Sequence, residues 1–408
     1  MKRSVLASVL LCLSFGTGVF AQTEWTLSGQ VRYRFESDMK DFNNDSAANN
    51  FNVLRSRLAA SFKPSDDVTA LIQLQDSRVL GEEKSTLGDG SADHLDFHQA
   101  YVKVDDLFEW PVSLKAGRME VIYGSQRLVG PVGWDNIGRS FDGVMVNLHG
   151  EHFSVDLFEF NEVDSVQIGD RGDRNIYGAY ADIKHSDNYK NQVFFIWQQT
   201  EPSDELSRYT VGFYSQGKAG RFFHETEFAY QGGNITPGAV ELDVEAFMAT
   251  LSAGFRFPAL SAAPAVSAGV DYLSGDDNPA DDKFKVFDTL YATNHKFYGF
   301  MDYFLNIPVH TFGLGLIDAH GEVAVTPAER TKAKIAYHYF SAVEDYRLAD
   351  GSTSTGFGQE LDVTINHAYT ESVAFTGGVS VFGPRDIFDE KKGTDTAAWL
   401  YAMVTVNL

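Results

Sequence analysis

Apolar and polar residues alternate along most of the chain with a period of two. In the segment 25–36, Trp25, Leu27 and Val31 fall on one face, whereas Arg32 and Arg34 fall on the other. The segments 191–200, 359–366 and 399–408 repeat the pattern, and we count about eighteen such segments of roughly ten residues. A half-buried strand of a soluble sheet also alternates. Ten residues, however, is the length that crosses a bilayer when the strand is tilted.

The connections between these segments alternate in length. Every second connection is short, and these fall at 63–67, 105–111, 149–152, 185–189, 217–220, 258–264, 326–330 and 368–371. Most of the others are longer and polar, and these fall at 37–49, 81–93, 123–138, 163–173, 275–308, 342–357 and 384–395. A soluble sandwich has no reason to separate loop lengths in this way. The pattern predicts an all-β fold, a closed antiparallel transmembrane β-barrel of about 18 strands with short periplasmic turns and long extracellular loops.

The first residues have the features of an export signal. Lys2 and Arg3 precede a largely apolar stretch, and Val19 and Ala21 supply a small-residue cleavage pattern. We therefore predict that residues 1–21 are a cleaved signal peptide and that residues 22–408 form a single barrel domain. Cys12, the one cysteine, lies within the signal, so the mature chain is expected to hold no disulfide and no thiolate. The predicted location is the outer membrane of a Gram-negative bacterium.

Charge narrows the possible partners. The formal net charge of −23 makes a nucleic-acid partner a poor expectation, because such proteins usually carry a basic face. Part of the acidic excess gathers at Asp276, Asp277, Asp281 and Asp282 in a long connection. We expect a solvated outer surface there and no cofactor, with Ca²⁺ on these acidic outer loops as the weaker alternative.

The face opposite the apolar one carries many cations. Arg32 and Arg34 lie on the first segment, and Arg55 and Arg57 on the second. The same parity turns inward Arg139, Arg174, Arg221, Lys332 and Lys334. The carboxylates expected to limit how tightly anions bind are Glu36, Asp142, Asp182, Glu225 and Glu360. These residues predict an anion-conducting path. The alternative is that arginine–carboxylate ladders only brace the barrel wall.

Catalytic patterns are weak in this sequence. His98, His295 and His338 are scattered without the HExxH spacing of a metalloprotease, and no nucleophile elbow or dinucleotide-binding fingerprint is present. We predict that the protein is not an enzyme and leave a barrel-embedded hydrolase as a remote alternative.

The stretch 114–146, LKAGRMEVIYGSQRLVGPVGWDNIGRSFDGVMV, resembles the signature of the alginate-export family of outer-membrane barrels. Other matching pieces are LIQLQDSRV at 71–79, HQAYVKV at 98–104, SGDDNP at 274–279 and TNHKFYGFMDYF at 293–304. The resemblance implies an eighteen-stranded barrel that passes an anionic polysaccharide through an arginine-lined constriction. The pore residues it implies are Arg118, Arg127, Arg139 and Asp142. It also implies that Asn294, His295 and Lys296 lie in a long loop folded over the pore.

The chain departs from the family in two ways. It is short for an alginate exporter, which leaves room for trimmed plugging or gating loops, and its last residue is Leu408 where such barrels usually end in an aromatic. Alternation also places Arg118 on the apolar face of Leu114 and Ala116, where a charge costs about 2–4 kcal/mol at the bilayer midplane. A position at the rim would avoid this cost. We predict instead a β-bulge near Gly117 that turns Arg118 inward.

The most specific reading is an outer-membrane channel that passes acidic, alginate-like saccharides by passive diffusion. The alternatives are a general or uptake porin for small anionic solutes and a purely structural barrel. Expected partners are the anionic saccharide, the lipid bilayer with its lipopolysaccharide, the barrel-assembly machinery and periplasmic export proteins. The direction of transport, the sugar and the oligomeric state stay open.

Overall fold

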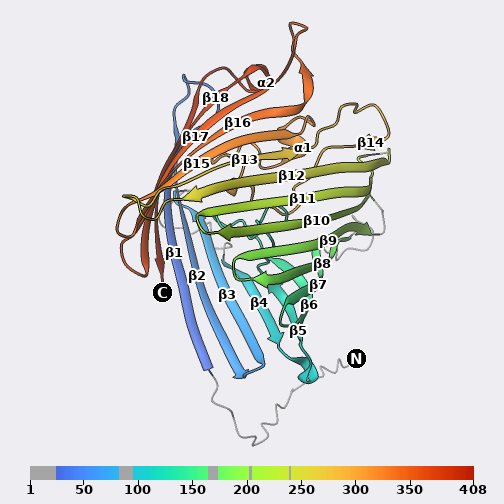
Figure 1. Ribbon diagram of the computed structural model, residues 1–408, viewed down its shortest axis with the longest axis vertical. Coiled ribbons are helices and arrows are strands. Elements are labelled where there is room, and N and C mark those ends of the chain that lie inside the picture. Colours follow the sequence, from blue (N-terminus) through green and yellow to red (C-terminus); the bar gives the residue numbers. More distant parts are fainter. Residues whose placement is uncertain (1–23, 82–94, 164–172, 202–204, 239) are drawn as a thin grey trace, which may run out of the picture.

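A computed structural model describes residues 24–81, 95–163, 173–201, 205–238 and 240–408. The predicted signal peptide, residues 1–21, lies outside these described residues. The strands follow one another around a closed antiparallel wall (Figure 1), as the alternation predicts. The wall strands are β1 (Glu24–Met39), β2 (Asn49–Ser65), β3 (Val68–Val79), β4 (Leu95–Val104), β5 (Val112–Met119), β6 (Phe141–His149), β7 (Phe153–Val163), β8 (Asp173–Ser186), β9 (Tyr189–Glu201), β10 (Leu206–Ala219), β11 (Phe222–Ile235), β12 (Leu242–Arg256), β13 (Ala265–Leu273), β15 (Leu316–Ala328), β16 (Thr331–Arg347), β17 (Thr353–Ala368), β18 (Val373–Pro384) and β19 (Ala397–Asn407).

These 18 strands confirm the predicted count, and the short and long connections fall at the predicted ends. The remaining elements are small. They are the two-residue β14 (Lys283–Phe284), which pairs in parallel with β12, the helices α1 (Ile307–His310) and α2 (Asp386–Lys391), and the 3-10 turns η2 (Leu107–Glu109) and η3 (Asn294–Lys296). Within the described residues, no helix has the length and apolar character needed to cross a membrane.

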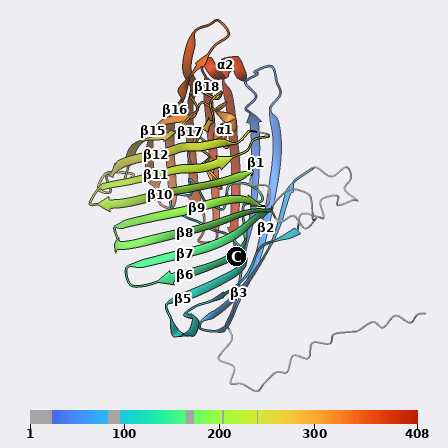
Figure 2. The same ribbon diagram turned by 90° about the vertical axis from the view of Figure 1, so that its right-hand side faces the viewer.

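The barrel closes where the first strand meets the last. β1 pairs with β19 from Gln30 opposite Asn407 to Met39 opposite Ala398. In Figure 2 the blue start of the wall lies beside its red end. Because every wall strand has a partner on both sides, the backbone N–H and C=O groups are satisfied without water, as a membrane-spanning sheet requires.

The two faces of the wall differ sharply. Outward side chains such as Trp25 and Leu27 are 65% and 72% exposed, on the surface that a bilayer would cover. Inward side chains of the same strand, Arg32 and Arg34, are buried. The buried core therefore lies inside the barrel, where inward side chains of the wall strands pack against residues from two long connections.

The predicted bulge at Gly117 is wrong. β5 pairs without interruption with β4 and with β6 through Gly117 and Arg118. The irregularity lies one strand away, where His98 of β4 is an extra residue between the pairs Gln73–Gln99 and Leu74–Phe97. Arg118 therefore stays on the face of Leu114 and Ala116, one residue before β5 ends. The chain avoids the cost of a charged residue at mid-depth by placing Arg118 at the outer end of a short strand.

Candidate functional site

Two long connections fold into the barrel and meet there. The first, residues 120–140, joins β5 to β6, and the second, residues 274–315, joins β13 to β15. We call them the first and second inserted loops. Val129 and Tyr291 form a parallel bridge between them, and Gly130 N donates to Tyr291 O at 2.9 Å. Thr293 N donates to Gln126 O at 2.9 Å. Because backbone bonds join the two loops, they form one constricting element and not two independent flaps.

Wall arginines of β1 and β2 hold the first inserted loop by its backbone. Arg32 donates to the carbonyls of Gly133, Trp134 and Asp135 at 2.7, 2.9 and 2.8 Å. Arg55 donates to the carbonyls of Gly133 and Asp135 at 3.3 and 3.1 Å. The fork of donors on a guanidinium suits several acceptors at once, which lysine could not match.

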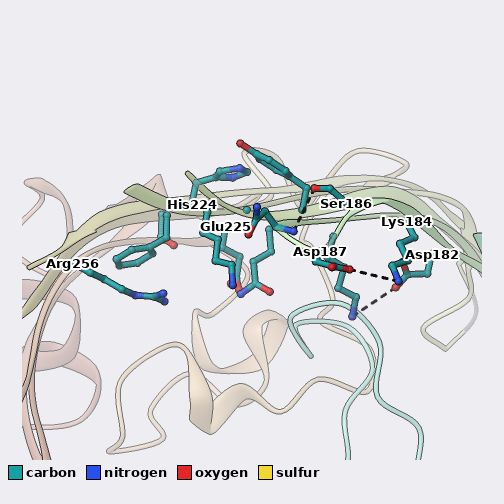
Figure 3. Close-up of a pocket in the computed structure, with 15 residues that line it drawn as sticks. Asp182, Lys184, Ser186, Asp187, His224, Glu225 and Arg256 are labelled. Atoms are coloured by element: carbon teal, nitrogen blue, oxygen red, sulfur yellow. Dashed lines mark hydrogen bonds and ion pairs between the residues drawn. The ribbon is translucent and has the colours of Figure 1, made fainter. Parts of the chain in front are cut away.

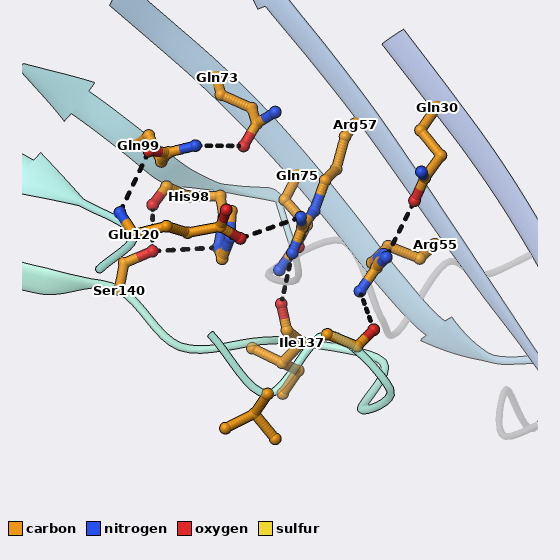
Figure 4. Close-up of polar contacts among 12 residues, drawn as sticks. Gln30, Arg55, Arg57, Gln73, Gln75, His98, Gln99, Glu120, Ile137 and Ser140 are labelled. Atoms are coloured by element: carbon orange, nitrogen blue, oxygen red, sulfur yellow. Dashed lines mark hydrogen bonds and ion pairs between the residues drawn. The ribbon is translucent and has the colours of Figure 1, made fainter. Parts of the chain in front are cut away.

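Arg34 and Arg57 combine a loop carbonyl with a carboxylate. Arg34 donates to Trp134 O at 2.6 Å and to Glu36 at 2.7 Å. Arg57 donates to Ile137 O at 3.3 Å and pairs with Glu120 at 3.2 Å. Figure 4 shows Arg55 and Arg57 reaching from the wall strands toward the loop.

Glu120 joins the start of the first inserted loop to two strands. It lies 2.6 Å from His98 Nε2 as well as 3.2 Å from Arg57, and its backbone N donates to Gln99 (Figure 4). Partial burial opposes the charged form, but the contacts with His98 and Arg57 outweigh it and lower the pKa of Glu120. The carboxylate is therefore charged at neutral pH and anchors the loop where it leaves β5.

An aromatic stack links both loops to the wall. The Arg34 guanidinium lies 4.0 Å from the Trp134 ring centre, and the Trp134 ring stacks on His295 at 4.3 Å. His295 Nδ1 lies 2.7 Å from Asp302 in the same loop. The resemblance correctly places Asn294, His295 and Lys296 in a long connection, where they form η3 inside the barrel.

The remaining predicted arginines lie in or beside the inserted loops. Arg127 is buried, pairs with Asp271 of β13 at 2.6 Å, and lies 3.9 Å from the Phe297 ring centre. Burial opposes its charge, but Asp271 and neighbouring acidic groups outweigh burial and raise the pKa of Arg127. Arg139 donates to the Tyr291 carbonyl and, at 3.1 Å, to that of Ala292, so it ties the end of the first loop to the second. Burial lowers the pKa of Arg139.

Arg118 and Asp142 lie apart from this set. Arg118 donates from Nε and Nη2 to the two carboxylate oxygens of Asp142, each at 2.9 Å, and it pairs with Asp96 at 3.3 Å. The Arg118 and Asp142 side chains are 36% and 54% exposed. The pair lies beside a cavity of about 340 Å³ between the first inserted loop and the wall, which Arg118 and Arg139 both line.

A group of accessible inward cations lies elsewhere, at the turn end of β8 to β12. A cavity of about 590 Å³ opens there, and Figure 3 shows Arg256 and Lys184 toward opposite ends of it. We call it the basic cavity; its cations are Lys184, Lys190, Lys218 and Arg256, and its carboxylates are Asp182, Asp187 and Glu225. The carboxylates neutralise this charge only in part, because Lys190 lies 3.9 Å from Asp182 and Lys184 lies 3.6 Å from Asp187.

Sequence reasoning missed these three lysines. Their signal was available, because Lys184, Lys190 and Lys218 follow the same alternation that turns Arg32 inward. At the opposite end of the barrel, two of the four acidic residues considered for Ca²⁺, Asp277 and Asp281, pair with Lys285 at 2.5 and 3.1 Å.

Known proteins match this architecture. The model of a family described as alginate export matches residues 23–400, and no curated protein matches the sequence. Among solved structures, the chain is similar to Acinetobacter baumannii OccAB4 at 12% identity and a TM-score of 0.63, covering 96% of this chain and 99% of that one. It is also similar to Pseudomonas aeruginosa OpdO, at 14% identity and a TM-score of 0.63, covering 94% and 97%. For Pseudomonas aeruginosa OprD the identity is 13% and the TM-score 0.59, covering 94% and 95%.

At such low identity, these solved structures show a shared fold and nothing finer. The family match goes further than the fold. It spans nearly the whole chain and includes both inserted loops and the strands that hold them. Family and fold together support an outer-membrane channel. The chain belongs to the alginate export family.

Proposed function

We propose that the barrel is an outer-membrane channel for acidic, alginate-like saccharides, which cross it by passive diffusion. The observation that carries this proposal is the concentration of cations on the inner wall of a chain whose net charge is −23. A saccharide that carries a carboxylate on each sugar would meet guanidinium or ammonium groups at both ends of the inserted loops. The proposal includes removal of residues 1–21, insertion by the barrel-assembly machinery and contact of the outer face with lipid and lipopolysaccharide.

In this proposal, the buried arginines and the accessible lysines have different roles. Arg32 and Arg55 donate to neutral carbonyls and have no carboxylate within their hydrogen-bond sets, so neither forms a direct ion pair. In a narrow site with low-dielectric walls, such charge raises the local concentration of anions. The lysines of the basic cavity are free enough to contact a carboxylate directly. Asp182 and Glu225 keep this contact shallow, so that the anion can leave again.

A second candidate function follows from the inserted loops. They fill the middle of the barrel with side chains such as Tyr291, Tyr298 and Phe304, all buried. The cavities on either side are about 590 and 340 Å³, which is the size range of sites for small ligands. This packing favours a general or uptake porin for small anionic solutes, unless the loops move to admit a polymer.

The test is a planar-bilayer measurement on the folded full-length barrel. The reversal potential in a KCl gradient gives the ion selectivity, and the current is then recorded with alginate oligomers of increasing length added to one side. Under the proposal, the pore is anion-selective and the oligomers block it at lower concentration as they lengthen. Block by monomers alone would favour the small-solute porin. A cation-selective pore that is indifferent to every oligomer would overturn both.

A further inference from the structure

Three side chains with metal-binding donors gather on the inner wall, away from the basic cavity. Asp318 and His320 are alternate residues of β15 and therefore share a face, and His338 of β16 lies directly opposite His320 in the strand pairing. One donor atom from each of the three lies within 4.8 Å of the others. Alternation along one strand and register across two produce this grouping, so it is a property of the rigid wall and not of a loop.

The distances within the group are those of a site that needs little adjustment. His338 Nδ1 lies 2.8 Å from Asp318 Oδ2, and His320 Nδ1 lies 3.7 Å from the same oxygen. Metal–nitrogen and metal–oxygen bonds of about 2.0–2.2 Å hold neighbouring ligand atoms at slightly more than 3 Å from one another. The observed distances of 2.8 and 3.7 Å lie on either side of this spacing.

Polar atoms around the group lack partners, which points to a missing ligand. His320 Nδ1 is buried and makes no hydrogen bond with any described residue. The same is true of Asp362 Oδ2, which lies 3.9 Å from His338 Nε2 on a side chain that is 1% exposed. An unpaired buried polar atom costs about 1–3 kcal/mol, so two in one place call for an explanation.

The charge balance of this part of the wall points the same way. Four buried carboxylates, those of Asp271, Asp318, Glu360 and Asp362, lie on β13, β15 and β17. Arg127 compensates Asp271. The two histidines are the remaining nearby groups that could carry positive charge among the described residues, and a bound divalent cation would compensate the other carboxylates without them.

We propose that Asp318, His320 and His338 bind a divalent transition-metal ion, with Zn²⁺ the ion this donor set suits best. Two imidazole nitrogens and one carboxylate oxygen are common zinc ligands, whereas Ca²⁺ prefers oxygen donors throughout. The fourth position falls to water. Asp318 is fully buried, but the His320 side chain is 19% exposed, which opens the group to the interior of the barrel. None of the three residues lines the basic cavity.

The experiment uses the full-length barrel folded in detergent, freed of metal with a chelator and dialysed against ZnCl₂. Bound zinc is counted by elemental analysis, and Co²⁺ is then added as a spectroscopic probe of coordination. We expect about one zinc per chain, and visible absorption of the cobalt form typical of a tetrahedral site. The His320→Ala and His338→Ala variants are expected to bind zinc at least about tenfold more weakly, the scale on which even an outer-shell partner matters.

The matched control is His367→Ala, because His367 lies on the neighbouring β17 and hydrogen-bonds Thr331 instead of joining the group. This variant should bind zinc like the wild type. Where a variant at His338 fails to fold, Asp318→Asn removes a ligand charge with almost no change in shape and keeps the test decisive. A wild-type barrel that binds no zinc would overturn the proposal. Zinc bound equally by the wild type and both histidine variants would do the same, because the ion would then lie elsewhere.

Discussion

Two sets of inward cations in this barrel do different work. Arg32 and Arg55 are buried and donate to the backbone of a loop, whereas Lys184, Lys190 and Lys218 line an open cavity beside carboxylates they only partly engage. The first set shapes the channel because it fixes a constriction. The second set is available to a passing anion. Counting inward cations therefore does not identify a binding site, since a buried guanidinium that holds loop carbonyls contributes its electric field and fixes the loop but makes no direct contact with a passing anion.

The largest effect is expected where a buried cation is removed from its carboxylate. Arg127→Met leaves Asp271 charged and buried without a partner, which we expect to lower the free energy of unfolding by about 3–5 kcal/mol. Denaturant titration of the folded barrel measures it. The double variant Arg127→Met, Asp271→Asn should recover most of the loss. If the double variant is as unstable as the single one, packing of Arg127 on Phe297 matters more than its charge.

Releasing the first inserted loop should have the next largest effect, and mainly on conductance. Arg32→Ala removes one donor from each of three consecutive loop carbonyls, which then keep only Arg34 or Arg55 as a partner. The loop is expected to leave the wall and the single-channel conductance to rise severalfold. An unchanged conductance would mean that Arg34, Arg55 and the Tyr291 bridge hold the loop without Arg32.

Removing the accessible cations should change selectivity and leave stability alone. In the triple variant Lys184→Gln, Lys190→Gln, Lys218→Gln, we expect the reversal potential to shift toward cation preference and the block by acidic oligomers to weaken. Stability should stay within about 0.5 kcal/mol of wild type at each exposed position. Lys63→Gln is the matched control, because Lys63 is an exposed lysine at the turn end of β2, outside the cavity. A shift in the single control about one third as large as that of the triple variant would show that total charge, and not the cavity, sets selectivity.

The smallest effect is expected at the exposed pair of Arg118 and Asp142. Surface ion pairs contribute about 0–1 kcal/mol, so Arg118→Gln should scarcely alter the denaturation midpoint. Acidic oligomers should also block the Arg118→Gln channel as they block the wild type, unless Arg118 contacts a ligand in the cavity that it lines together with Arg139. If the oligomers block the Arg118→Gln channel more weakly, Arg118 contacts the passing anion directly, as we propose for the lysines of the basic cavity.

The wall was predictable from the sequence, and the interior was not. Period-two alternation and the regular change in loop length suffice for the eighteen strands, because both follow from a sheet with one face in lipid. Neither pattern says where a long loop goes. The partners of Arg32 and Arg55 are backbone carbonyls, which every residue possesses, so no residue type in the loop marks the contact.

The error at Gly117 has a similar origin. A glycine between Ala116 and Arg118 is an ordinary bulge signal, and Gly117 does adopt a positive φ of 123°. A β-carbon at this residue would lie 2.2 Å from the Ala100 carbonyl oxygen, so glycine serves a close approach of the two strands. The extra residue sits instead in the partner strand, at His98, which has no such signal.

The seam between β1 and β19 has a consequence for how the protein is made. Leu408 N donates to Gly29 O at 2.8 Å, and the side chains of Gln30 and Asn407 bond across 377 positions of the chain. The entropy of bringing such distant ends together grows only slowly, by about 0.6 kcal/mol for each doubling of the separation. The order of synthesis is the greater difficulty for assembly. β1 is made first, and one of its edges stays unpaired, and open to wrong partners, until the last strand is made. Ring closure is thus the natural last step of assembly, and a nascent barrel is vulnerable until it occurs.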